Sequence, residues 1–166
     1  MVVEEITWSP VGWVVLLAAA ACAVVPLGWA LLTVPASRPS ALIPLLLVVL
    51  LVGGIGALFH RLRATLGPDT LTVGFGPFRE RLPLARIAAC DPVTYRWLAY
   101  GGYGIRYAFW RRAKLYNVPG DRGRAVQLTL DDGRRVLFSA HDPAAVCAAL
   151  RPHCPNCRHA ESADRP

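Results

Sequence analysis

The chain has 166 residues with a formal net charge of +7, and 54% of its residues are hydrophobic. This length allows one domain of about 100 residues beside a pair of apolar segments, and little more. The five cysteines are too scattered for a disulfide framework, which excludes the class of small disulfide-rich secreted domains. Cys90 and Cys147 are instead expected to be small core residues.

Apolar and basic residues occupy different parts of the chain. The hydrophobic excess lies before His60, whereas all basic residues except Arg38 lie from His60 onward. The acidic residues before that point are Glu4 and Glu5, so the start of the chain, residues 1–12, lacks the positive charge of a secretory signal peptide. The sequence therefore divides into an apolar N-terminal part and a basic C-terminal domain.

Two uncharged stretches predict a membrane hairpin. The first predicted transmembrane helix covers residues 13–33 and the second covers residues 40–59, with a short external link over residues 34–39. The run Pro39–Phe59 contains no charged residue for 21 positions. At about 1.5 Å of rise per residue, such a helix spans the roughly 30 Å of a bilayer core.

The basic residues predict an orientation. Arg61 and Arg63 follow the second predicted span directly, whereas the link between the spans carries only Arg38. The positive-inside rule places the basic domain in the cytoplasm, and the N-terminal segment 1–12 by parity. We therefore expect a multi-pass protein of the bacterial inner membrane, in contact with the lipid bilayer and with both termini cytoplasmic.

Residues 64–151 show the patterning of a β domain. Leu71, Val73 and Phe75 alternate with small or polar residues, as expected for a strand with one buried face. Gly76–Pro77 predicts a turn, and Asp132–Gly133 between two alternating runs indicates a hairpin with a two-residue loop. Further strands are expected over residues 78–84, 87–97, 105–107, 114–118, 126–130 and 134–139.

The hydrophobic period changes to that of a helix near the C-terminus. Asp142 is a suitable N-cap, Pro143 suits the first helical position, and Ala144–Leu150 supplies good helix formers. About seven short strands followed by one helix predict a mostly-β sandwich or partly open barrel that a C-terminal helix closes. Residues 152–166 are expected to form a disordered tail.

Several short motifs together resemble a known group of proteins. They are Gly101–Arg106 (GGYGIR), Leu115–Val118 (LYNV), Val126–Leu128 (VQL), Gly133–Leu137 (GRRVL) and Asp142–Pro143. In this combination they resemble the small prokaryotic membrane proteins in which two N-terminal transmembrane helices precede a PH-like domain. Tyr103 departs from the pattern, which usually has tryptophan there. The resemblance implies a layout and a fold but no activity, because the group largely lacks an assigned function.

One segment combines aromatic and basic residues and is the first candidate binding site. The run RWLAYGGYGIRYAFWRR, residues 96–112, could contact anionic lipid headgroups or a partner through both kinds of side chain. In the alternative interpretation the aromatic rings fill the core and the arginines are solvated; nucleic acid is not expected, because no nucleic-acid module is recognised. The candidate lipid- or partner-binding residues are Arg96, Trp97, Tyr103, Arg106, Trp110, Arg111 and Arg112.

A second candidate lies near the C-terminus. Cys154 and Cys157 form a CxxC pair, and His153 and His159 flank it, so four residues could act as zinc ligands. The pair also has the spacing of a redox motif, although the βαβ context of thioredoxin-like proteins is missing. A plain disordered tail is the third interpretation.

No arrangement of residues typical of catalysis is present in the sequence. Asp131 and Asp132 are adjacent at a turn, where their side chains diverge, and no glycine-rich loop has phosphate-binding spacing. We therefore expect a non-enzymatic protein without a cofactor: a membrane-anchored PH-like binding or scaffolding protein that contacts a membrane-protein partner, another copy of itself or anionic headgroups. The alternatives are a redox- or metal-responsive membrane protein and a small accessory subunit of a membrane complex.

Overall fold

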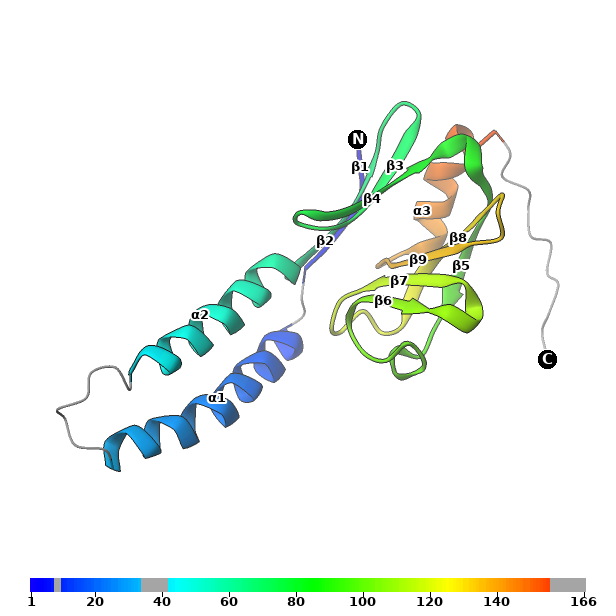
Figure 1. The fold of residues 1–166 in the computed structure, drawn as a ribbon. Helices are drawn as coiled ribbons and strands as arrows, with labels where there is room; N and C mark the ends of the chain where they lie inside the picture. The colour runs from blue at the N-terminus through cyan, green and yellow to red at the C-terminus, as the bar shows by residue number, and fades with distance from the viewer. Residues whose placement is uncertain (8–9, 34–41, 156–166) are drawn as a thin grey trace.

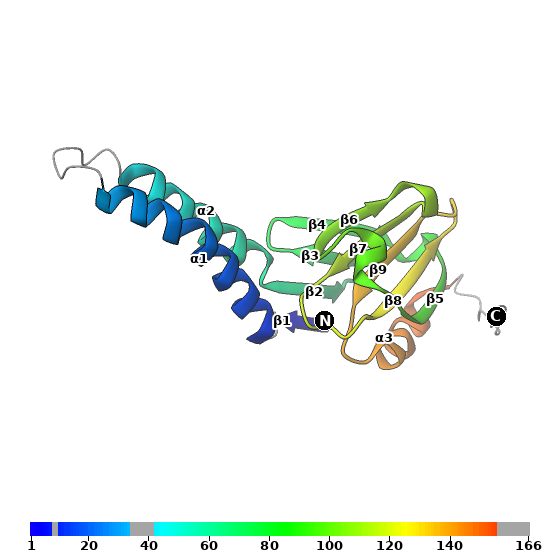
Figure 2. The same ribbon diagram turned by 90° about the horizontal axis from the view of Figure 1, so that it is seen from below.

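The structure is a computed structural model, and it describes residues 1–7, 10–33 and 42–155. A pair of helices, α1 (Pro10–Thr33) and α2 (Leu42–Phe59), extends from a mostly-β domain (Figures 1 and 2). The two helices run side by side in both views. The domain consists of two sheets and the helix α3 (Pro143–Leu150) near the C-terminus.

The predicted transmembrane hairpin is wrong. Within the described ranges, no helix combines the length and the apolar character that crossing a bilayer requires. The apolar run that supported the second span is not one described helix, because residues 39–41 lie outside the described residues and α2 has 18 residues. The expected multi-pass placement in an inner membrane with both termini cytoplasmic is therefore wrong as well. The predicted link, residues 34–39, also lies outside the described residues.

The first sheet joins the two ends of the helical pair. Its order is β1-β2-β3-β4 and all its pairs are antiparallel. β1 precedes α1 and β2 follows α2, so the helices connect adjacent strands, and the N-terminal ammonium donates a hydrogen bond to the carbonyl of Leu66 at 2.8 Å. Neither β1 nor β2 was predicted from the sequence. The bounds are β1 Val2–Thr7, β2 Arg61–Leu66, β3 Thr70–Phe75 and β4 Phe78–Pro83.

The second sheet has the order β5-β8-β9-β7-β6, in which β7 and β9 are parallel and the other pairs antiparallel. Consecutive hairpins cannot produce this order, because the β8–β9 hairpin inserts between β5 and β7. The fold is therefore mostly β with two sheets and a C-terminal helix, and the expected PH-like sandwich behind a membrane hairpin is wrong. The bounds are β5 Ile87–Thr94, β6 Gly104–Ala108, β7 Ala113–Asn117, β8 Arg124–Leu130 and β9 Arg135–Ser139.

The local signals near the C-terminus mark real turns and caps. The side chain of Asp142 accepts a hydrogen bond from the amide of Ala145 at 3.0 Å, which confirms the predicted N-cap of α3. The β8–β9 hairpin is also confirmed. Its loop is longer than predicted, because the amide of Leu130 bonds the carbonyl of Arg134 at 2.9 Å and Gly133 takes a φ of +77°.

The core lies between the sheets and beneath α3. Phe75 of the first sheet and Phe138 of the second are fully buried in one cluster, to which α3 contributes Leu150. Cys90 and Cys147 belong to the same cluster, with their Sγ atoms 2.9 Å apart. The hydrogen bond from the Cys90 thiol lowers the pKa of the Cys147 thiol despite its burial. Both cysteines are thus core residues, as expected.

A polar cluster around Glu80 crosses from the first sheet to the second. One carboxylate oxygen of Glu80 in β4 accepts hydrogen bonds from Lys114 Nζ at 2.9 Å and Tyr116 Oη at 2.8 Å, both from β7. The other oxygen accepts from Arg134 Nη1 at 3.0 Å. Burial raises the pKa of the Glu80 carboxyl, but these hydrogen bonds and charges outweigh burial and hold the pKa below its ordinary value of 4.5.

We predict that Glu80→Gln lowers the free energy of unfolding by about 1–3 kcal/mol at neutral pH, because Lys114 and Arg134 lose a charged acceptor. Because the pKa of the Glu80 carboxyl is lower in the folded than in the unfolded protein, its ionised form stabilises the fold at a pH above the unfolded pKa. This stabilisation is lost as the pH falls through the folded pKa and the carboxylate becomes protonated. The difference between the variant and the wild type should therefore shrink below about pH 4.5. Urea denaturation followed by circular dichroism measures it.

Asp69→Asn is the matched control, since Asp69 is an exposed acid at the β2–β3 turn. Its unfolding free energy should stay within about 0.5 kcal/mol of the wild type. An equal loss in both variants would contradict a specific role for Glu80.

Candidate functional site

The segment Arg96–Arg112 lies at one edge of the second sheet. It connects β5 to β7 through a short 3-10 helix at Trp97–Tyr100, the edge strand β6 and a second 3-10 turn at Phe109–Arg111. β6 pairs only with β7 in the described sheet, so its other side is open. The segment therefore presents its side chains at the margin of the domain.

Most aromatic residues of this segment lie on the surface. Trp110 is 94% exposed and Phe109 is 77% exposed, whereas Tyr107 and Trp97 are about half exposed. Neighbouring rings contact one another: Trp97 stacks on Tyr103 with centroids 5.0 Å apart, and Tyr107 meets Phe109 edge-on at 4.7 Å. Phe109 and Trp110 therefore do not fill the core, contrary to the alternative interpretation of this segment.

The candidate arginines divide between two places. Arg96 and Arg111 line a hollow of about 450 Å³ over the second sheet, together with Arg135 of β9. The guanidinium of Arg111 lies over the ring of Tyr100, 5.5 Å from its centroid. Arg106 instead donates a hydrogen bond from Nε to the carbonyl of Tyr103 at 3.1 Å, and both residues line a separate hollow beside Phe59 of α2. Arg112 is exposed at the end of the second turn.

Sequence reasoning missed Arg135, which the parallel pairing of β7 and β9 brings beside this segment. Ala113 of β7 is opposite Arg135 in the register, and the amide of Arg135 bonds the carbonyl of Arg112 at 2.9 Å. No sequence signal marked this neighbour, because the two strands are joined only through β8. We call the exposed members of this group the aromatic–arginine surface: Arg96, Trp97, Arg106, Tyr107, Phe109, Trp110, Arg111, Arg112 and Arg135.

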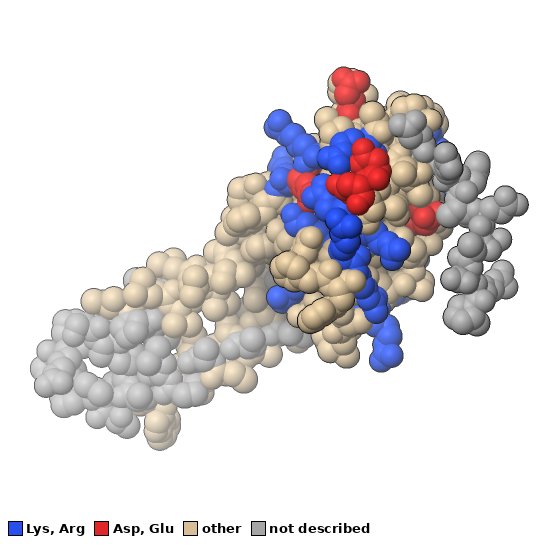
Figure 3. Space-filling view, turned by 45° about the vertical axis from the view of Figure 1, so that its right-hand side comes forward, with Lys and Arg blue, Asp and Glu red and all other residues tan. Residues whose placement is uncertain are grey.

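The aromatic–arginine surface carries uncompensated positive charge. The chain has no acidic residue between Asp91 and Asp121. In the described part of the chain, no acidic side chain forms an ion pair with an arginine of this surface. Figure 3 shows basic side chains in a band across the β domain, with acidic groups clustered near one end of the band. The surface therefore attracts anionic groups.

A buried polar network anchors the base of this segment. Asp121 accepts hydrogen bonds from the hydroxyls of Tyr95 and Ser139 and, at 2.8 Å, from the amide of Gly123. Burial and then the neighbouring Asp121 raise the pKa of the Tyr95 hydroxyl, so Tyr95 stays protonated and donates. The network ties the end of β5 to β9 and to the loop after β7. Sequence reasoning missed it, because its members lie far apart in the chain.

The C-terminal cysteine and histidine candidates are not brought together within the described residues. Cys154 is 4% exposed and belongs to the main core cluster, whereas His153 is on the surface. Cys157 and His159 lie outside the described residues. No group of three or more histidine, cysteine or acidic residues is placed to hold a metal ion in the ranges that the structure describes.

Comparison with known proteins gives no relative: no family model, no curated protein and no solved structure matches the chain. The resemblance to small membrane proteins with a PH-like domain is wrong on the ground of the structure. Its defining feature, a pair of transmembrane helices, is not found among the described helices, and no family model supports the motifs that suggested it.

We predict that Tyr95→Phe lowers the free energy of unfolding by about 1–2 kcal/mol, because the buried Asp121 carboxylate loses one donor. Tyr107→Phe makes the same chemical change at an exposed ring and should have an effect below about 0.5 kcal/mol. Urea denaturation of both variants measures the difference. Equal stabilities would show that the Asp121 network does not anchor the segment.

Proposed function

We propose that the chain is a non-enzymatic binding protein whose β domain holds a partner protein through the aromatic–arginine surface. The observation that carries this proposal is Trp110, which is 94% exposed beside Phe109, another ring that is mostly exposed. Large apolar rings are less stable in water than when buried, so their burial against a partner would contribute favourable binding free energy. Tryptophan, tyrosine and arginine are also the residues most enriched where partner proteins are held.

The charge of the surface favours a partner with acidic groups. Arg96, Arg111 and Arg135 line one hollow whose lining contains no acidic residue, so a carboxylate that enters it gains charge-assisted hydrogen bonds. The guanidinium plane of Arg111 is already held against Tyr100, which reduces the entropy that binding costs. Aromatic anchors thus supply affinity, and the arginines supply orientation and fast, salt-dependent association.

Selection of random displayed peptides on the full chain tests this proposal. We predict that the selected peptides combine aspartate or glutamate with apolar residues and bind more weakly as the salt concentration rises. Trp110→Ala should lower the affinity for a selected peptide at least tenfold in calorimetry, because a tryptophan hot spot contributes about 2 kcal/mol or more to binding. Arg111→Gln should weaken it severalfold and reduce the salt dependence.

Trp29→Ala is the matched control, since Trp29 of α1 is another exposed tryptophan, far along the chain from this surface. It should leave peptide affinity unchanged. Equal weakening by both tryptophan variants would contradict the assignment of this surface. If the chain bound vesicles of anionic lipid and no peptide was selected, the surface would bind lipid headgroups and not a partner protein. That result would overturn the proposal.

A further inference from the structure

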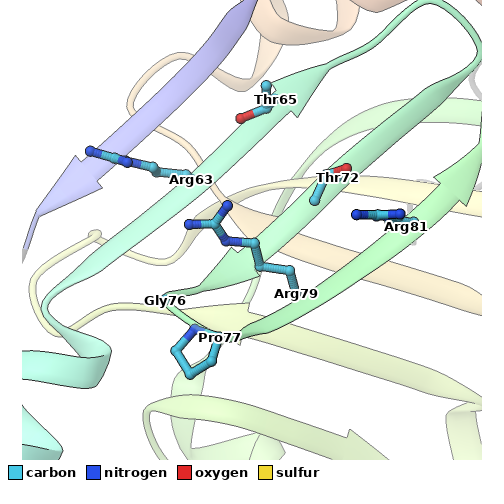
Figure 4. A pocket seen from close by; sticks show the side chains of 7 residues that line it. All are labelled: Arg63, Thr65, Thr72, Gly76, Pro77, Arg79 and Arg81. Atoms are coloured by element: carbon cyan, nitrogen blue, oxygen red, sulfur yellow. The ribbon is translucent and has the colours of Figure 1, made fainter.

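A second basic hollow lies on the first sheet, apart from the aromatic–arginine surface. Its volume is about 470 Å³, and β2, β3, β4 and the β3–β4 turn supply its lining. Figure 4 shows the side chains on one face of these strands, with the Arg79 guanidinium reaching across β3 toward β2. The lining residues are Arg63, Thr65, Thr72, Gly76, Pro77, Arg79 and Arg81.

The strand register assembles this hollow from two cross-strand rows. In the first row, Arg63 of β2 is opposite Gly74 of β3, which is opposite Arg79 of β4. In the second row, Thr65, Thr72 and Arg81 are opposite one another in the same way. Long arginines on the flanking strands therefore rise on both sides of a central strand with short side chains. We call these five side chains, Arg63, Thr65, Thr72, Arg79 and Arg81, the arginine cradle.

Gly74 leaves the centre of the cradle without a side chain. Its φ is +153°, and a Cβ atom built there would lie 2.1 Å from the carbonyl oxygen of Phe78. No side chain can therefore occupy the space between Arg63 and Arg79 without moving the backbone of β4. The backbone of β3 and β4 therefore keeps position 74, between Arg63 and Arg79, free of a side chain.

The orientation of β4 fixes the direction of its arginines. Successive side chains of a strand point to opposite faces. Glu80 is held on the inner face by Lys114, Tyr116 and Arg134, so Arg79 and Arg81 must point outward. The cradle is thus positioned by the same cluster that joins the two sheets.

The cradle keeps an excess of positive charge. Arg63 lies 3.2 Å from Glu5 of β1, which also approaches Arg61 at 3.7 Å. No acidic side chain in the described ranges forms an ion pair with Arg79 or Arg81. The guanidinium groups of Arg79 and Arg81 therefore face the hollow without a carboxylate partner in these ranges, whereas the Arg63 side chain extends toward β1, where Glu5 pairs with it (Figure 4).

We propose that the arginine cradle binds a small ligand that carries more than one phosphate group. Guanidinium groups bind phosphate through paired N–H donors, and the hydroxyls of Thr65 and Thr72 can donate to further phosphate oxygens. The donors come from both sides of the hollow, which suits tetrahedral groups with oxygens in several directions better than one planar carboxylate. The volume falls within the roughly 300–1,000 Å³ of small-molecule sites, which exceeds the need of one phosphate.

Calorimetric titration of the full chain with inorganic phosphate, pyrophosphate and tripolyphosphate tests the proposal, with citrate as a polycarboxylate of similar charge. Affinity should rise with the number of phosphate groups and exceed that for citrate at equal ionic strength. Arg79→Gln and Arg81→Gln should each lower the affinity for tripolyphosphate about tenfold or more, since each substitution removes a charged pair of donors. Thr72→Val should weaken it about threefold, because one neutral donor is lost.

Glu5→Gln gives a change of opposite sign, because it removes the carboxylate beside Arg63; affinity should rise severalfold, which no loss of folding can mimic. Arg151→Gln is the charge-matched control at an exposed arginine after α3 and should leave affinity unchanged. Equal affinity for citrate and tripolyphosphate, or equal weakening by Arg151→Gln and Arg79→Gln, would overturn the proposal. Peptide binding at the aromatic–arginine surface is independent of either result.

Discussion

The carboxylate of Glu80 is the interaction on which the arrangement of both sheets depends. It joins β4 to β7 through Lys114 and Tyr116, and it joins both to the β8–β9 hairpin through Arg134. Because adjacent strand residues face opposite sides, the inward position of Glu80 also sets the outward position of its neighbours in β4. A partly buried ion cluster costs desolvation, but breaking it leaves two cations without an acceptor. The cluster therefore specifies one packing of the sheets more than it adds net stability.

Some of this fold follows from local sequence, and some does not. The alternation of Leu71, Val73 and Phe75 and the cap at Asp142 act over a few residues, so each could be predicted and each is found. The pairing of β1 with β2 brings together residues separated by the whole helical pair. The parallel pairing of β7 and β9 likewise depends on where an intervening hairpin inserts. Such pairings are decided by global packing, on which a short pattern gives no information.

The same distinction explains the fate of the candidate residues. Arg96 and Arg111 were recognisable because they share one segment with exposed rings, but Arg135 joins them only through the sheet. The arginine cradle had no signal at all, because its members come from three strands and look like ordinary solvated residues in sequence. The apolar stretches gave the opposite error. Counting uncharged positions measures only the composition of a stretch, whereas no described helix combines the length and the apolar character that crossing a bilayer requires.

The distribution of acidic residues explains why the net charge appears at two surfaces rather than evenly. Glu5 pairs with Arg61 and Arg63, and Asp131 and Asp132 both pair with Arg86. Glu80 forms ion pairs with Lys114 and Arg134, while Asp121 is buried and accepts hydrogen bonds from Tyr95 and Ser139. These acids serve the structure, and none of them pairs with the arginines of β4 or of the segment 96–112. The arginines of β4 and of this segment are therefore without an acidic ion-pair partner among the described residues, and they are available to anionic groups from outside the chain.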